Sequence, residues 1–76
     1  MVSVRINIIN NSVTDVVRDN RISLKAKGIY ALAADMQRVK QECFMDDISH
    51  HCKEGDRAIH TGLEELEIYG YVSCSN

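Results

Sequence analysis

Residues 53–71 read KEGDRAIHTGLEELEIYGY and hold the start, the body and the end of one helix. Asp56 opens the helix after Gly55, at the point where a carboxylate meets the positive end of the helix dipole. Gly70 stands where a left-handed C-terminal cap belongs, so the sequence predicts a helix over residues 56–69. Its apolar side chains form one stripe at helical spacing, namely Ala58, Ile59, Gly62, Leu63 and Leu66.

The opposite face of this helix is polar. Its side chains recur at i, i+3, i+4 and i+7, as Arg57, His60, Thr61 and Glu64. The three residues at 53–55 form a turn with a glycine, which is the connection that a helix-turn-helix needs. We therefore predict that residues 56–69 form the second, or recognition, helix of a helix-turn-helix, and that the protein binds nucleic acid.

A second helix is predicted over residues 24–37, with Ser23 as its N-cap. An apolar row recurs every four residues along it, and we expect this row to face the core: Leu24, Gly28, Leu32 and Met36, widened by Ile29, Ala31 and Ala33. The polar residues 38–42 that follow are expected to form a loop.

Two strands and two short helices are predicted around these helices. β-Branched and polar residues alternate over residues 2–9, which is typical of a half-buried strand. This strand is available to pair with a final strand at 71–74. Ser12, three residues before Asp15, resembles an N-cap and predicts a short helix over 13–19.

The segment before the turn is predicted to begin with a brief buried strand at residues 43–44. Asp46 and Asp47 then begin a second short helix that ends at about Cys52, because acidic residues favour a first turn. We expect Met45, Ile48 and Cys52 to face inward. The expected fold is mainly α with a small β element.

Length and composition exclude several classes of protein. A chain of 76 residues forms at most one domain, with no room for a deep substrate pocket. We recognise neither a signal peptide, a membrane-spanning run nor a phosphate-binding glycine motif. The three cysteines have no CxxC spacing and fit free thiols in a reducing cytoplasm. We expect that the protein is not an enzyme and that it uses neither a cofactor nor a small-molecule substrate.

A metal site is the alternative that the cysteines and histidines suggest. The candidate ligands are Cys43, His50, His51, Cys52 and His60. Adjacent His50, His51 and Cys52 lack the separated pairs of structural zinc sites. We therefore expect no metal and assign Cys43 and Cys52 to the core.

Charge is unevenly distributed along the chain, although the formal net charge is only −2. Residues 1–41 contain seven Lys or Arg against three acids, whereas residues 42–76 contain two against eight. The recognition segment is thus acidic, which opposes phosphate binding. Lys25 and Lys27 lie at the positive end of their helix, where they are either solvated or held by a partner such as a phosphate.

The segments RISLKAKGIYALAADM (21–36) and FMDDISHHCKEGDRAIHTGLEELEIYGYV (44–72) resemble a known family. It is the N-terminal winged helix-turn-helix domain of phage, plasmid and Gram-positive replication initiators and replisome organisers, including DnaD-like proteins. The resemblance implies three core helices, with residues 55–69 in the major groove of double-stranded DNA. Gly62 stands where alanine is usual, which suggests close helix packing. The chain stops where the wing would begin, so we expect a truncated wing: either the wing is absent, or the chain is a fragment of a longer protein.

The resemblance and the exposed face together give a set of DNA-binding residues. They are Lys53, Asp56, Arg57, His60 and Thr61, with Lys25 and Lys27 from the earlier helix. An alternative is a module of the same fold that binds a replication protein or another copy of itself through the acidic recognition helix. If Lys25, Lys27, Arg38 and Lys40 flank that helix in space, DNA is favoured. We expect residues 1–76 to be one domain of a longer protein.

Overall fold

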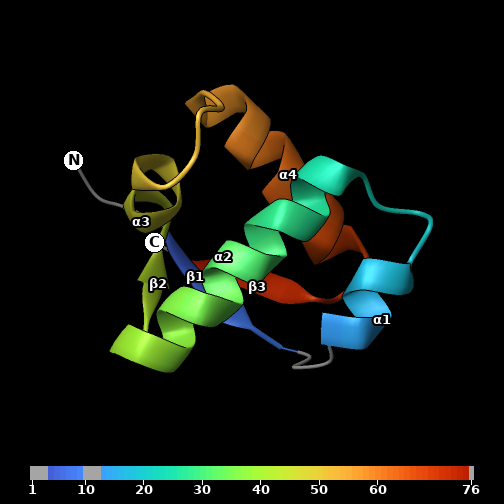
Figure 1. Cartoon of the computed structure of the whole chain (residues 1–76), viewed down its shortest axis with the longest axis horizontal. Coiled ribbons are helices and arrows are strands. Elements are labelled where there is room, and N and C mark those ends of the chain that lie inside the picture. Colours follow the sequence, from blue (N-terminus) through green and yellow to red (C-terminus); the bar gives the residue numbers. More distant parts are fainter. Residues whose placement is uncertain (1–3, 10–12, 76) are drawn as a thin grey trace.

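The computed structural model describes residues 4–9 and 13–75, which form helices packed on a small antiparallel sheet (Figure 1). The elements follow in the order β1 (Arg5–Ile8), α1 (Val13–Arg18), α2 (Leu24–Lys40), β2 (Cys43–Phe44), α3 (Met45–His50), α4 (Asp56–Ile68) and β3 (Val72–Ser75). The predicted class, mainly α with a small β element, is confirmed.

The sheet has the strand order β2-β1-β3, with β1 antiparallel to both neighbours. Ile6 lies opposite Cys43 on one side and Cys74 on the other, so the N-terminal strand joins two segments far apart in the sequence. The predicted pairing of this strand with the final strand is confirmed. Residues 2 and 3 of the predicted strand, and the Ser12 cap, lie outside the described residues.

α2 packs against α4 and the sheet through a face that only partly matches the predicted one, because Ile29 and Ala33 are buried as expected but the row from Leu24 to Met36 is not. Its buried residues are Ala26, Ile29, Tyr30 and Ala33. Gly28 and Ala31 are exposed, Leu32 and Met36 are only partly buried, and the Leu24 side chain is 85% exposed. The physical reason is that apolar residues occupy two neighbouring faces of α2, and helical spacing alone does not choose between them. Small alanines allow closer approach to neighbouring elements than leucines do.

The predicted loop at residues 38–42 is confirmed only for residues 41–42, because α2 continues to Lys40. Polar residues indicate that a segment is exposed, not that a helix ends, and this segment contains neither glycine nor proline to end a helix. The end is set by Gln41, which adopts a left-handed conformation (φ 66°) and donates its N–H to the Gln37 carbonyl. That conformation is uncommon outside glycine.

The other predicted elements agree closely with the structure. α1 and β2 lie at the predicted positions, and α4 covers all but the last residue of the predicted 56–69 helix. Gly70 has the positive φ of 77° that a left-handed cap requires. α3 ends at His50, earlier than predicted, so Cys52 lies in the loop and is half-buried while Met45 and Ile48 are buried.

The core lies between α2, α4 and the sheet. Tyr30 of α2 meets Tyr71, just before β3, edge to face with ring centroids 6.3 Å apart. Such a pair adds about 0.5–1.5 kcal/mol to the burial of the rings. Among the described residues no polar or charged residue is buried, and no helix is both long and apolar enough to cross a membrane.

Candidate nucleic-acid interface

α4 is fixed in place by its apolar stripe and by a close approach to α2. Ile59, Gly62, Leu63 and Leu66 are buried, as the spacing predicted. A Cβ built on Gly62 would overlap the Cδ1 atom of Ile29 on α2. The glycine thus leaves room for the Ile29 side chain, and the same Cβ would lie 3.6 Å from the Ala26 Cα atom, which agrees with the close packing that Gly62 suggested.

The opposite face of α4 lies in solvent, as predicted. Arg57, His60 and Thr61 are all exposed in the first half of the helix. The Thr61 hydroxyl donates a hydrogen bond to the Arg57 carbonyl at 2.9 Å, which directs its proton back to the helix. Within the described residues no ion pair holds the Arg57 guanidinium. The guanidinium therefore has donors available for another molecule.

The loop between α3 and α4 brings one more cation to this end of the helix. Lys53 is exposed and precedes the N-cap residue Gly55, which makes no side-chain capping bond. Asp56, the first residue of α4, accepts a hydrogen bond from the Ser49 hydroxyl of α3 at 3.4 Å. Asp56 thus joins the two helices, and the structure gives it a local role that the sequence did not indicate.

The two lysines of the predicted set lie in different places. Lys25 borders a hollow beside α4, whose other wall includes Glu54 and Ile59. Lys27 does not line this hollow, and its position two residues later on a helix turns it by about 200°. Of the two, only Lys25 is placed next to the elements of the candidate interface.

The other two basic residues that were expected to flank α4, Arg38 and Lys40, do not do so. Arg38 and Lys40 lie at the C-terminal end of α2, beside β2 and away from α4 (Figure 1). Arg38 pairs with Asp35 at 2.7 Å and Lys40 pairs with Asp47 at 3.2 Å. Because the acids of these pairs neutralise the cations, the charge separation seen along the sequence is reduced in space.

The acids of α4 have different surroundings. Glu65 turns toward α2, where its carboxylate accepts hydrogen bonds from the N–H and the hydroxyl of Ser23, both at 2.8 Å. The Ser23 N–H, helped by the hydroxyl and by the charge of Lys25, lowers the pKa of Glu65. Glu64 and Glu67 are exposed. The acidic character of the solvent face is therefore carried mainly by these two residues, in the second half of α4.

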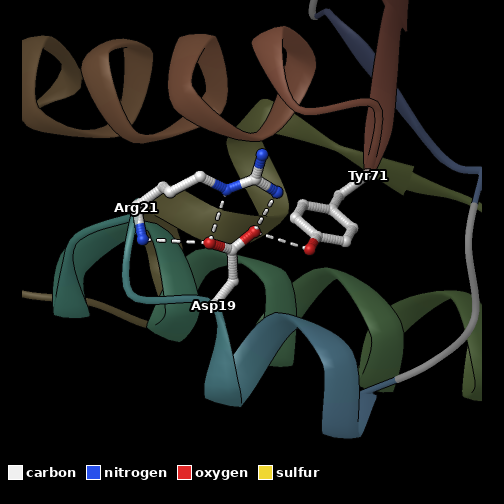
Figure 2. A network of polar contacts seen from close by, with 3 residues as sticks. All are labelled: Asp19, Arg21 and Tyr71. Atoms are coloured by element: carbon white, nitrogen blue, oxygen red, sulfur yellow. Dashed lines mark hydrogen bonds and ion pairs between the residues drawn. The ribbon is translucent and has the colours of Figure 1, made fainter.

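A polar network that the sequence analysis missed holds the loop between α1 and α2. The Asp19 carboxylate accepts hydrogen bonds from the backbone N–H and the guanidinium of Arg21, and from the Tyr71 hydroxyl at 2.7 Å (Figure 2). Bonds from Arg21, and then from Tyr71, hold the pKa of Asp19 well below its usual range. The Arg21 guanidinium also lies 4.3 Å from the centre of the Tyr69 ring.

This network spans 52 residues of sequence, from Asp19 to Tyr71. The spacing of Asp19 and Arg21 is a possible turn signal, but nothing in the sequence connects them to the end of α4. The network fixes the C-terminal end of α4 and the start of β3 against the α1–α2 loop. It orients the helix that carries the candidate interface without being part of its exposed face.

The candidate metal ligands do not assemble into a site. Within residues 4–9 and 13–75, no three His, Cys, Asp or Glu side chains lie close enough to hold a metal ion. Cys43, Cys52 and Cys74 are free thiols.

Comparisons with protein-family models, with curated proteins and with solved structures found no match.

Proposed function

We propose that this protein binds duplex DNA through the first half of α4 and the loop before it, with α3 and α4 acting as a helix-turn-helix. The observation that carries the proposal is the solvent face of α4. This helix is held rigidly on α2 by Gly62, and it presents Arg57 and His60 outward. A well-supported helix with a polar exposed face is the element that such proteins place in the major groove.

The distribution of charge along α4 supports an approach by its N-terminal end. The cations Lys53 and Arg57 lie in the loop and the first half, beside the exposed acids Glu54 and Asp56, whereas the second half carries the exposed acids Glu64 and Glu67 without a cation. Helix-turn-helix proteins contact base edges with the N-terminal residues of the recognition helix. Glu64 and Glu67 then lie farther from the bases, and Glu65 is engaged by Ser23.

The proposed contacts follow from the chemistry of each group. Arg57 offers a planar fork of donors that suits the O6 and N7 acceptors of guanine. Lys53 offers a mobile cation for a backbone phosphate. Gly55 leaves the first turn of α4 without a side-chain cap, so that backbone N–H groups there are placed to donate to a phosphate.

The sheet supports a winged variant of this fold in which the wing is reduced. β3 follows α4 as the first strand of a wing would, and its partner is β1, from the other end of the chain. β1 would thus take the place of the strand that a wing normally returns. Together with the resemblance to replication initiators and replisome organisers, this arrangement favours a role of the domain in DNA replication.

Fluorescence anisotropy with a labelled mixed-sequence duplex tests the proposal. We expect binding at low salt that weakens steeply near 0.2 M salt, because each neutralised phosphate releases counterions. Arg57→Ala should weaken binding to this duplex, and Lys53→Ala should reduce the salt slope by about one. Arg38→Ala is the matched control, since Arg38 is paired with Asp35 in the C-terminal part of α2.

The contrary result is equally clear. No binding at low salt, or binding that Arg57→Ala and Arg38→Ala weaken alike, would overturn docking through α4. In the second case the DNA would be held by overall charge, and the face of α4 would have no part in recognition.

A further inference from the structure

The apolar row that the sequence assigned to the core opens instead on a hollow at the surface. Leu24, Gly28 and Leu32 of α2 line one wall, and Cys52 and Ile59 line the other. The hollow has a volume of about 340 Å³ and lies between the first half of α2, the α3–α4 loop and the start of α4. It is therefore a largely apolar surface that no element of the described chain covers.

The Leu24 side chain contributes little to the packing of the fold. Its side chain is 85% exposed, at the first residue of α2. Single exposed leucines are common on protein surfaces. Leu24, however, belongs to a row that continues through Gly28 to Leu32 in the same hollow, so its exposed side chain extends an apolar lining that suits apolar side chains of a ligand.

Gly28 gives independent support for an interaction site at this hollow. Glycine in a helix interior is less stable than alanine, and a Cβ at Gly28 would meet no atom within 4 Å. At Gly62, by contrast, a Cβ would overlap the Ile29 side chain. No internal contact of the described chain explains the glycine at position 28, and its missing side chain deepens the hollow. An approaching partner would explain it.

The rims of the hollow carry opposite charges. Lys25 stands on the α2 side, and Glu54 stands on the loop side. Within the described residues neither side chain forms an ion pair, whereas Arg21, Arg38 and Lys40 each do. A ligand lying along the row would thus meet a cation on one flank and an anion on the other.

We propose that this hollow docks an amphipathic helix of a partner protein, whose acidic flank faces Lys25 and whose basic flank faces Glu54. The row from Leu24 to Leu32 extends about 12 Å, at 1.5 Å per residue. That length matches apolar anchors at i, i+4 and i+7 of a bound helix, the spacing that helix-in-groove recognition uses. The proposal is independent of DNA binding.

Two synthetic helical peptides test it against the full chain. Both are about 15 residues long, helix-stabilised, and carry leucines at i, i+4 and i+7. One has glutamates on the flank that would face Lys25 and lysines on the other, and the second exchanges these charges. Fluorescence anisotropy should show binding of the first at least about tenfold tighter than the second.

Three substitutions locate the binding. Gly28→Leu should fill the hollow and weaken binding of the first peptide by at least about tenfold, without lowering the thermal midpoint of the protein. Lys25→Glu should remove the preference between the two peptides. Lys27→Glu is the matched control, because Lys27 lies on the same helix but outside the hollow, and it should leave the preference in place.

Several results would overturn the proposal. They include no binding of either peptide at millimolar concentration, equal binding of both, and binding that Gly28→Leu leaves unchanged. Sedimentation would reveal another occupant: a dimer of this chain that Leu24→Asp dissociates would assign the hollow to a second copy. Because the thermal midpoint is followed throughout, a loss of binding through unfolding is recognised as such.

Discussion

The carboxylate of Glu65 accepts hydrogen bonds from both the N–H and the hydroxyl of Ser23, 42 residues earlier in the chain. The Ser23 hydroxyl in turn accepts from the N–H of Ala26, in the first turn of α2. A capping box normally uses a Glu three residues after the cap. Here α4 supplies that carboxylate, so the capping arrangement at the N-terminal end of α2 is complete only when the two helices pack.

This shared cap predicts a measurable coupling between the helices. Ser23→Ala should lower the free energy of unfolding by about 1 kcal/mol, and Glu65→Ala by a similar amount or less. The double variant should cost less than the sum by about 0.5 kcal/mol or more. Urea denaturation measures all three, and Glu64→Ala, on an exposed neighbour, should change stability by less than about 0.5 kcal/mol. Additive effects would refute the shared cap.

The two helix-interior glycines should respond to alanine in opposite directions. Gly28→Ala should raise the free energy of unfolding by about 0.5–1 kcal/mol, because its side chain meets open space. Gly62→Ala should lower it by roughly 1–3 kcal/mol, because the new methyl overlaps Ile29. Thermal and urea denaturation test both.

Ile29→Val supplies the control for Gly62, because it removes the Cδ1 atom that the methyl meets. The Ile29→Val, Gly62→Ala double variant should therefore be more stable than the sum of the single effects predicts. A stabilising Gly62→Ala, or strict additivity with Ile29→Val, would mean that the helices are not in contact as described.

Asp19 should make stability depend on pH in the acid range. Its pKa is lowered in the folded protein by Arg21 and Tyr71, so the ionised carboxylate favours folding above the unfolded pKa of about 3.9. This contribution is lost as pH falls below that value toward the folded pKa. Asp19→Asn should lower the thermal midpoint at pH 7 and flatten the decline below about pH 4.

The matched control for this experiment is Asp35→Asn, since Asp35 forms an exposed pair with Arg38. Such pairs contribute little to stability, so its pH profile should follow that of the original protein. Tyr71→Phe keeps the ring beside Tyr30 and removes only the bond to Asp19, and should show part of the Asp19→Asn effect. Identical profiles for Asp19→Asn and Asp35→Asn would contradict the network.

The three thiols should react with an alkylating reagent in a defined order. Burial raises the pKa of the Cys43 thiol to about 11, so Cys43 is both covered and protonated at pH 8. Burial also raises the pKa of Cys74, whereas Cys52 lies half-buried in the α3–α4 loop. Mass spectrometry over time should show Cys52 modified first and Cys43 last, at the rate of unfolding. Early modification of Cys43 in native buffer would be inconsistent with its place in the sheet.

If DNA docks on α4, the exposed acids of the helix should limit its affinity. Glu64→Gln should strengthen duplex binding at low salt by roughly 0.5–1 kcal/mol, and the gain should shrink as salt screens the charge. Glu42→Gln, an exposed acid in the segment before β2, is the control with the same change in net charge. Anisotropy titrations measure both variants. Equal gains in affinity would mean that DNA does not contact the α4 face specifically.

The local sequence was sufficient to predict the elements whose signals lie within a few residues. The helix at 56–69, its buried stripe and its Gly70 cap depend on spacing and on glycine geometry, both of which act locally. The alternation in the first strand and the Ser23 cap are of the same kind. The polar face of the helix at 56–69 also identified Arg57, His60 and Thr61 as exposed, because the polar residues of an amphipathic helix point away from its buried apolar stripe.

Other features required the tertiary structure, because they depend on which surfaces meet. α2 has apolar residues on two faces, and only the positions of α4 and the sheet decide that Ala26 is buried while Leu24 is exposed. The bond from Tyr71 to Asp19, and the cap that Glu65 provides for Ser23, join residues too distant for any local signal. The sequence by itself determined where the helices begin. The packing of α2 against α4 and the sheet decided which acidic side chains accept hydrogen bonds from distant residues, and which apolar row of α2 remains exposed to a partner.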